Sequence, residues 1–399
     1  MIDSIAELVI VSLIIAWIFK SIHLPELVGM LFVGVLFGPY VLNRLSPELL
    51  DVSGQLRLVA LIVILLRAGF ELKRDTLNRI GRPAILLSMI PALFETVAIC
   101  LLSPLLLGLS YMEGAILGTV IAAVSPAVVV PLMIRFIEEK KGTKKGIPTL
   151  ILAASSIDDV FVIVIYSVLI GIYTGNEVNV AWQLAGIPIS IVLGIAVGIA
   201  CGLILLWFFK KFNPRATKRV LVIMAVSVLL LRIEQVLANI VPFAALLSVM
   251  SIGFIILEKQ EKYAHEISNK LAKIWVVAEI ALFTLVGSEV NIEVAWQSGL
   301  HGVILIILGL VARSMGTWIS IIGTDLNFKE KLFVVISYWP KATVQAAIGA
   351  APLMAMKLAG MDTAPGQTIL AVAVLSIVLT APTGAIAIVR YGNKWLEKE

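Results

Sequence analysis

The chain is a series of long apolar runs separated by short polar segments. A helix that spans a membrane needs about 20 mainly apolar residues. By this measure the pattern predicts an all-α polytopic protein with about thirteen transmembrane helices. The expected spans are 4–22, 25–42, 54–72, 83–107, 113–136, 147–173, 183–211, 216–236, 240–257, 266–287, 299–323, 328–356 and 366–390. Few residues remain between the runs, so we expect no soluble domain.

The composition supports a membrane protein. Apolar residues make up 60% of the 399 residues and charged residues only 14%, against about 25% charged residues in a typical soluble protein. The mean hydropathy is +1.04. A soluble fold of this size could not bury so much apolar surface. The first run lacks a basic leader segment, so we interpret it as a retained helix and not a signal peptide.

The basic residues predict the orientation. If the N-terminus faces outside and the C-terminus the cytoplasm, 24 of the 31 Lys and Arg residues fall on the cytoplasmic side, as expected for a cell-membrane protein. Only Arg44, Arg57, Arg232 and Lys357 fall on the outer side, and three basic residues lie inside spans: Arg67, Arg313 and Lys341.

The spans also suggest an internal repeat. If the seventh is a linker, residues 1–175 and 213–399 form two six-helix units joined by the helix 176–212, and the odd linker gives the units opposite orientations. Pro126 lies in the middle of the fifth span and Pro340 in the middle of the twelfth. We therefore predict two crossed broken helices at a shared site. The alternative is that proline is simply frequent in membrane helices.

Two adjacent carboxylates are the strongest chemical signal. Asp158 and Asp159 lie in the middle of the sixth span, where one carboxylate alone costs roughly 2.5–3.5 kcal/mol. Neighbouring helical residues point about 100° apart, so the two can reach different partners. Ser155 lies one turn before Asp159. Serine, aspartate and freed backbone carbonyls supply the oxygen ligands that a hard cation such as Na⁺ prefers.

Other charges within the spans need partners. Glu95 in the fourth span and Arg313 in the eleventh are predicted to form an ion pair, although Arg313 could instead pair with Asp158. Lys341, directly after Pro340, is expected to offset the negative ends of half-helices at the crossing. Glu279 in the tenth span and Arg67 near the inner end of the third are weaker candidates.

These strings resemble the NHA-type sodium/proton antiporters, the two-aspartate branch of the cation:proton antiporter superfamily. The resemblance rests on LPELVGMLFVGVLFGP, AAVSPAVVVP, KGIPTLILAASSIDDV, FTLVGSEVNI, SYWPKATVQAAIGAAPL and LSIVLTAPTGA, and it extends over essentially the whole chain. It implies an elevator-type homodimer in which one domain moves against a dimer-forming domain. The chain lacks the long hydrophilic termini of the animal relatives, so we expect a prokaryotic form.

The resemblance also assigns roles. Asp159 would bind the cation and the proton, Asp158 would be its neighbour, and Ser155 and Ser125 would be nearby oxygens. Glu95 and Arg313 would link two core helices. Many superfamily members carry an acid where this chain has Ser125, and electrogenic bacterial members carry a lysine where it has Arg313. These departures bear on the stoichiometry, and we expect electroneutral exchange.

Antiport of Na⁺ or Li⁺ for H⁺ is therefore the leading functional hypothesis, with membrane lipids as the surroundings. A K⁺/H⁺ exchanger is the nearest alternative, and a bile-acid-type symporter would need a wider cavity. An intramembrane aspartyl protease needs its two carboxylates on different helices, typically with a GxGD string that is missing here. We expect no enzyme activity, no cofactor and no nucleic-acid partner. Neither the two cysteines nor the three histidines have metal-site spacing.

Overall fold

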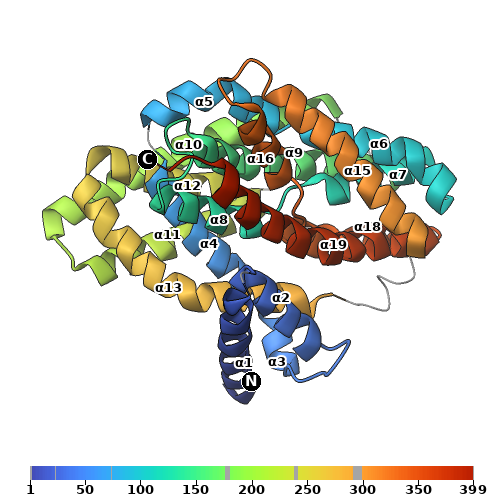
Figure 1. Cartoon of the computed structure of the whole chain (residues 1–399), viewed down its shortest axis with the longest axis horizontal. Coiled ribbons are helices and arrows are strands. Elements are labelled where there is room, and N and C mark those ends of the chain that lie inside the picture. Colours follow the sequence, from blue (N-terminus) through green and yellow to red (C-terminus); the bar gives the residue numbers. More distant parts are fainter. Residues whose placement is uncertain are drawn as a thin grey trace.

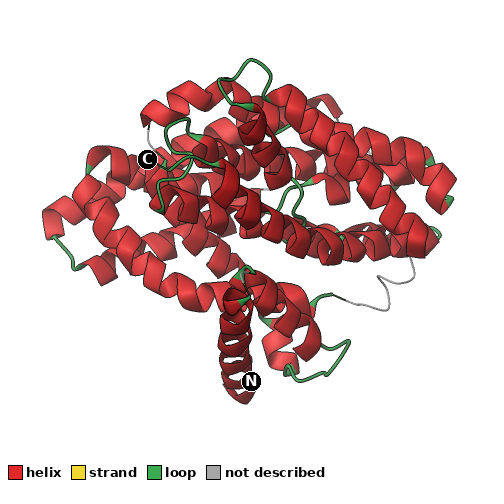
Figure 2. Cartoon of the chain, in the orientation of Figure 1, coloured by secondary structure: helices red, strands yellow, loops and turns green. Residues whose placement is uncertain are grey.

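Helices make up almost all of the protein (Figure 2). The computed structural model describes residues 2–22, 24–72, 74–175, 180–237, 241–290 and 299–398. Within these ranges extended pairing is confined to an isolated bridge between Lys141 and Lys398. The helices of the first half are α1 (Ile2–Ser21), α2 (Glu26–Phe37), α3 (Pro47–Asp51), α4 (Ser53–Glu71), α5 (Arg74–Leu87), α6 (Ile90–Leu107), α7 (Tyr111–Ala122), α8 (Pro126–Glu138) and α9 (Ile147–Tyr173).

The second half continues the same architecture. Its helices are α10 (Val180–Phe212), α11 (Ala216–Leu237), α12 (Ala245–Lys259), α13 (Glu261–Ser288), α15 (Gly299–Ser320), α16 (Phe328–Ser337), α17 (Thr343–Ile348), α18 (Ala351–Leu358) and α19 (Ala364–Trp395). The expected boundary between the first repeat and the linker, at residue 176, and the expected first residue of the ninth span, 240, lie outside the described residues. The division into two repeats stays a prediction.

Ten helical segments in the described ranges are long and apolar enough to cross a membrane, fewer than the thirteen spans expected. The three remaining predicted spans, 25–42, 240–257 and 328–356, contain shorter helices. They are α2, α12 and the interrupted series α16 to α18. The hydropathy of a run does not reveal where a helix stops inside it, so the number of apolar runs exceeded the number of full-length helices.

The predicted fourth span is not one continuous helix. It is divided between α5 and α6, and Met89 between them has φ −131° and ψ −51°. Pro91 has no backbone N–H and its ring excludes the carbonyl of residue 87 from a helical position. This proline therefore explains why the helix restarts at Ile90. The sequence analysis had not recognised it as a break.

The helices pack into two groups. A scaffold group consists of α1, α2, α4 and α10–α13, in which α13 packs on α2 and α4, and α12 on α4 and α10. A site group consists of α5–α9 and α15–α19, in which α6 packs on α7 and α15, and α19 on most of the others. In Figure 1, α11 and α13 lie on the left and α6, α7 and α15 on the right. The groups meet where α4 packs on α8 and α10 on α9.

Glycines let the scaffold helices approach to backbone contact. A Cβ atom placed on Gly69 of α4 would lie 2.1 Å from the carbonyl oxygen of Met250 on α12 and 3.1 Å from Cα of Gly253. Gly34 on α2 and Gly287 on the facing α13 allow the same close approach between those two helices. Small residues at helix crossings allow close van der Waals packing in membranes. The scaffold group is therefore held at fixed helix-to-helix distances.

Candidate ion-binding site

Two broken helices meet in the middle of the site group. α7 ends at Ala122 and α8 starts at Pro126, while α16 ends at Ser337 and α17 starts at Thr343. The two breaks are in direct contact, because the backbone N–H of Ser125 donates to the carbonyl of Pro340 at 2.9 Å. The prediction of two broken helices that cross at Pro126 and Pro340 is confirmed.

Side chains donate hydrogen bonds to the backbone carbonyls that the first break leaves without helical partners. The carbonyl of Ala122 accepts hydrogen bonds from Nη1 of Arg313 and, at 3.4 Å, from Nζ of Lys341. The carbonyl of Ala123 accepts one from Nε2 of Gln345 at 3.0 Å. Backbone groups in a membrane must be satisfied within the protein. These two carbonyls are therefore already engaged by side chains of the protein, and the expectation that freed carbonyls serve as cation ligands stays a prediction.

Asp158 is fully buried and held by the first break. Its Oδ2 accepts a hydrogen bond from the backbone N–H of Val124 at 2.7 Å, and Nη2 of Arg313 lies 3.4 Å from the same oxygen. Its Oδ1 is also buried and has no hydrogen-bond partner. One oxygen of this carboxylate is thus used to fix the broken helix, and the other is unsatisfied.

Asp159 has a different environment from its neighbour. Its side chain is partly exposed, and its Oδ1 is buried without a hydrogen-bond partner. No ion pair of Asp159 is found among the residues that the structure describes. The two adjacent carboxylates therefore do point to different surroundings, as their helical offset predicted.

A buried charge cluster surrounds the breaks. Oε2 of Glu95 accepts from Nη1 of Arg313 at 2.9 Å and from Nζ of Lys341 at 2.6 Å. All three side chains are at most 1% exposed. Arg313 contacts both Glu95 and Asp158, so both partners considered for it from the sequence are present. The Lys341 ammonium offsets one half-helix end, as expected, and also pairs with Glu95, which was not expected.

The formal charges of this cluster cancel except at one residue. Glu95 and Asp158 carry two negative charges, and Arg313 and Lys341 carry two positive charges. Asp159 is left as an additional carboxylate. An uncompensated charge is costly in a low-dielectric interior. A proton or a bound monovalent cation would neutralise it.

In the described part of the chain, the hydroxyls of Ser155 and Ser125 hydrogen-bond to groups other than the two aspartates. Oγ of Ser155 donates to the carbonyl of Leu152, one turn earlier in α9, at 3.1 Å. Oγ of Ser125 lies 3.4 Å from Oγ1 of Thr343, which joins the two breaks a second time. Both serine hydroxyls keep lone pairs that a cation could use. Their proposed contribution to cation binding stays a prediction.

The sequence analysis missed several polar residues of the crossing. Gln345 binds the end of α7, and Thr380 of α19 accepts a hydrogen bond from the backbone N–H of Lys341 at 2.9 Å. Tyr338 offers its carbonyl to Nε of Arg313 at 2.6 Å. These side chains are buried within apolar runs. Each could have been found as a polar residue in an otherwise apolar span, the same signal that identified the aspartates.

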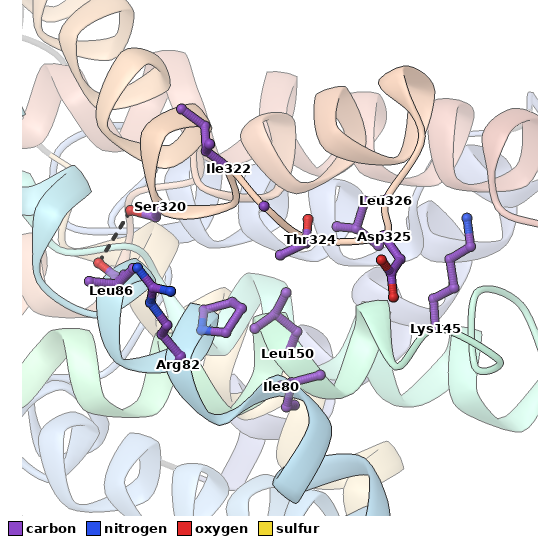
Figure 3. A pocket seen from close by; sticks show the side chains of 12 residues that line it. Ile80, Arg82, Leu86, Lys145, Leu150, Ser320, Ile322, Thr324, Asp325 and Leu326 are labelled. Atoms are coloured by element: carbon purple, nitrogen blue, oxygen red, sulfur yellow. Dashed lines mark hydrogen bonds between the residues drawn. The ribbon is translucent and has the colours of Figure 1, made fainter.

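A separate cavity opens between α5, α9 and the segment after α15 (Figure 3). Its volume is about 250 Å³, and Arg82, Lys145 and Asp325 are the charged residues in its lining. Oγ of Ser320 donates to the carbonyl of Leu86 at its wall, at 3.3 Å. None of the site residues predicted from the sequence lines it. This cavity is therefore distinct from the carboxylate site.

Comparisons with known proteins agree with this geometry. The family described as "Sodium/hydrogen exchanger, transmembrane" matches residues 8–391. The chain belongs to the sodium/hydrogen exchanger family. Human sodium/hydrogen exchanger 9B2 is 33% identical over 384 residues, 94% of this chain and 70% of the relative. Human sodium/hydrogen exchanger 9B1 is 29% identical over 386 residues, 94% of this chain and 73% of the relative.

The fold of this exchanger-family protein matches that of a solved antiporter. The sodium proton antiporter MjNhaP1 from Methanocaldococcus jannaschii, solved at pH 8, superposes with a TM-score of 0.78 at 18% identity, over 98% of both chains. This likeness confirms the all-helical antiporter fold. The two exchanger relatives named above are human proteins, so they lend no support to the expected prokaryotic form.

Proposed function

We propose that this protein exchanges Na⁺ or Li⁺ for H⁺ across a membrane by alternating access, with Asp159 as the carboxylate that binds the cation and the proton in turn. The observation that carries the proposal is the charge cluster. Two acids and two bases of the cluster cancel, and the adjacent Asp159 forms no ion pair with the residues that the structure describes. Proton and cation are then alternative ways of neutralising one group, which makes exchange obligatory.

The same reasoning supports an electroneutral cycle of one proton per Na⁺. Arg313 stays charged throughout, because an arginine does not lose its proton in proteins. Lys341 is paired with Glu95 at 2.6 Å. With these charges held in the cluster, Asp159 is the group that changes its occupant. The carrier would then be neutral in both the protonated and the Na⁺-bound form.

The wider arrangement follows from the resemblance to the two-aspartate branch. We place the protein as a homodimer in the cell membrane, surrounded by lipid, with the N-terminus outside and the C-terminus in the cytoplasm, and with a role in pH homeostasis. The scaffold group would form the dimer interface, and the site group would move. Asp158, Ser155 and Ser125 would support the cation near Asp159, and Pro126 and Pro340 would keep the two breaks open.

Reconstitution tests the proposal. Liposomes containing the protein and an internal pH dye receive Na⁺, Li⁺, K⁺ or choline in turn. We expect Na⁺ and Li⁺ to move protons and choline to move none. A response to K⁺ that equals or exceeds the response to Na⁺ would favour the K⁺/H⁺ alternative. The absence of any cation-dependent pH change would contradict the proposal.

A further inference from the structure

Among the described residues, two ion pairs join the scaffold group to the site group: Arg74 on α5 with Glu258 on α12 at 3.7 Å, and Arg67 with Glu138, in which the base is buried. Nη2 of Arg67 on α4 lies 2.8 Å from Oε1 of Glu138 on α8. Arg67 is only 8% exposed. The partner helix α8 begins at the first break, so it belongs to the part of the molecule that carries the ion site. Sliding of the site group past the scaffold group would change the distance between these two side chains.

A second acid shares the cavity into which Arg67 projects. The cavity has a volume of about 250 Å³ and is lined by Arg67, Glu138 and, from α13, Trp275 and Glu279. Nε of Arg67 is buried and has no hydrogen-bond partner. Glu279 forms no ion pair with any of the residues that the structure describes. The guanidinium thus has a free donor, and an acid without a cationic partner lies in the same cavity.

The other charges in the lining already have partners. Glu26 pairs with Lys20 at 2.9 Å, and Arg135 pairs with Glu139 one turn later on α8 at 2.7 Å. Among the acids that line this cavity, Glu138 and Glu279 are the two that are not paired with a described base other than Arg67. Glu138 lies on the site group, and Glu279 lies on α13, which packs on α4 within the scaffold group.

We propose that Arg67 exchanges carboxylate partners during transport, binding Glu138 in the state seen here and Glu279 when α8 moves away. This inference rests on the proposed alternating-access function, which requires the two groups to move. Leaving a buried guanidinium without a counter-charge is strongly unfavourable. Glu279 removes that penalty because it stays beside Arg67 on the scaffold side. The balance between the two pairs then sets which state the resting protein prefers.

Distances between the two groups test the exchange directly. Spin labels are attached to Lys140→Cys, just after α8, and to Lys273→Cys on α13, because both lysines are exposed. The two native cysteines are first removed by Cys100→Ser and Cys201→Ser. Pulsed electron resonance in liposomes gives the ratio of the two distance populations. We expect Glu138→Gln to lower the ratio of the population in the present state to the population in the other state by about fivefold or more. We expect Glu279→Gln to raise the same ratio by a similar factor.

The controls separate partner exchange from a fixed ion pair. Glu261→Gln removes an exposed acid at the start of α13 that lies outside this cavity and pairs with His265, and we expect it to leave the ratio unchanged. If Glu138→Gln lowers the ratio while Glu279→Gln has no effect, Arg67 and Glu138 form a one-sided lock and the exchange is overturned. If Glu138→Gln does not fold, Glu138→Asp, which shortens the acid by one methylene group, carries the same expectation.

Failure of the inference is distinguishable from failure of the proposed function. A single, unchanging distance population in labelled protein that still exchanges ions would overturn the movement of α8 relative to α13. Unsubstituted protein that moves no protons in response to Na⁺ would instead contradict the proposed function. The population ratios of the charge variants are measured without transport, so they test the exchange of partners in either case.

Discussion

Lys341 and Glu95 form a buried ion pair between residues that are 246 positions apart, with Nζ 2.6 Å from Oε2. The same carboxylate oxygen binds Arg313 at 2.9 Å. One acid of the first half thus holds two bases of the second half. Arg313 also contacts Asp158 and the last residue of α7, and it thereby links the aspartate-bearing helix α9 to the first break.

Replacement of Asp159 by asparagine is predicted to abolish exchange. Asp159→Asn keeps the shape of the side chain and removes the charge that a proton or Na⁺ would neutralise. We expect no Na⁺-driven pH change in liposomes, with unchanged thermal stability. Ser167→Ala is the matched control on the same helix, because the Ser167 hydroxyl only donates to Ile163 of its own helix. Full exchange by Asp159→Asn would remove Asp159 from the proposed role.

Protons and Na⁺ are predicted to compete for the same carboxylate. Below the pKa of the site, each lower pH unit leaves about ten times less of the deprotonated form, so the apparent Na⁺ affinity should weaken about tenfold per unit. Above that pKa the affinity should be constant. Titration of Na⁺-dependent exchange between pH 6 and pH 9 measures this slope. An affinity that does not change over that range would indicate separate sites.

Removal of the acid at the centre of the charge cluster is predicted to destabilise the protein. Glu95→Gln leaves two buried bases with only Asp158 nearby, and breaking a buried pair typically costs about 3–5 kcal/mol. We expect a lower melting temperature in detergent. Adding Lys341→Met to Glu95→Gln should recover part of the loss, because it removes one of the bases left unpaired. Losses that simply add would mean that the two residues act independently.

The exchange cycle is predicted to be insensitive to voltage. Moving one net charge across 100 mV is worth about 2.3 kcal/mol, whereas a neutral cycle gains nothing. Liposomes with equal Na⁺ and equal pH on both sides receive a potassium-diffusion potential through valinomycin. We expect no Na⁺ accumulation. Sustained accumulation would show a second proton per cycle and would direct attention to Asp158.

The contact between α4 and α12 is predicted to tolerate no side chain at Gly69. In Gly69→Ala the new Cβ would meet the Met250 carbonyl oxygen at 2.1 Å, so the helices would have to separate. We expect a clear loss of thermal stability and of dimer yield. Gly81→Ala on α5 is the control, since no described atom beyond its own helix backbone lies within 4 Å of its added Cβ. Equal stability of the two variants would show that the α4–α12 contact can widen freely.

Much of the site could be predicted because a charge inside an apolar run is rare and costly. That signal identified Asp158, Asp159, Glu95, Arg313 and Lys341, and the mid-span prolines identified the two breaks. The pairing of these charges was only partly predictable. Spacing along one helix says which residues share a face, and it says nothing about which distant helix faces them.

The missed features have equally physical causes. Gln345 and Thr380 carry no charge, so hydropathy gives them little weight, although they satisfy backbone groups at the crossing. The interruption before Ile90 depends on Pro91, which was counted as part of an apolar run. The start of α12 at Ala245 lies inside apolar sequence without a polar signal, whereas the end of α2 at Phe37 is followed by Gly38 and Pro39, a stop signal that the count of apolar residues ignored.

The long separation between the partners of the charge cluster has a consequence for biogenesis. Glu95, Asp158 and Asp159 enter the membrane more than 150 residues before Arg313, the first basic residue of the cluster, has been synthesised. Until then the ribosome-bound chain must shield three carboxylates with water, protons or the insertion machinery. Co-expressed halves divided between α10 and α11 should therefore accumulate only together, and the first half alone should be a substrate for membrane quality control.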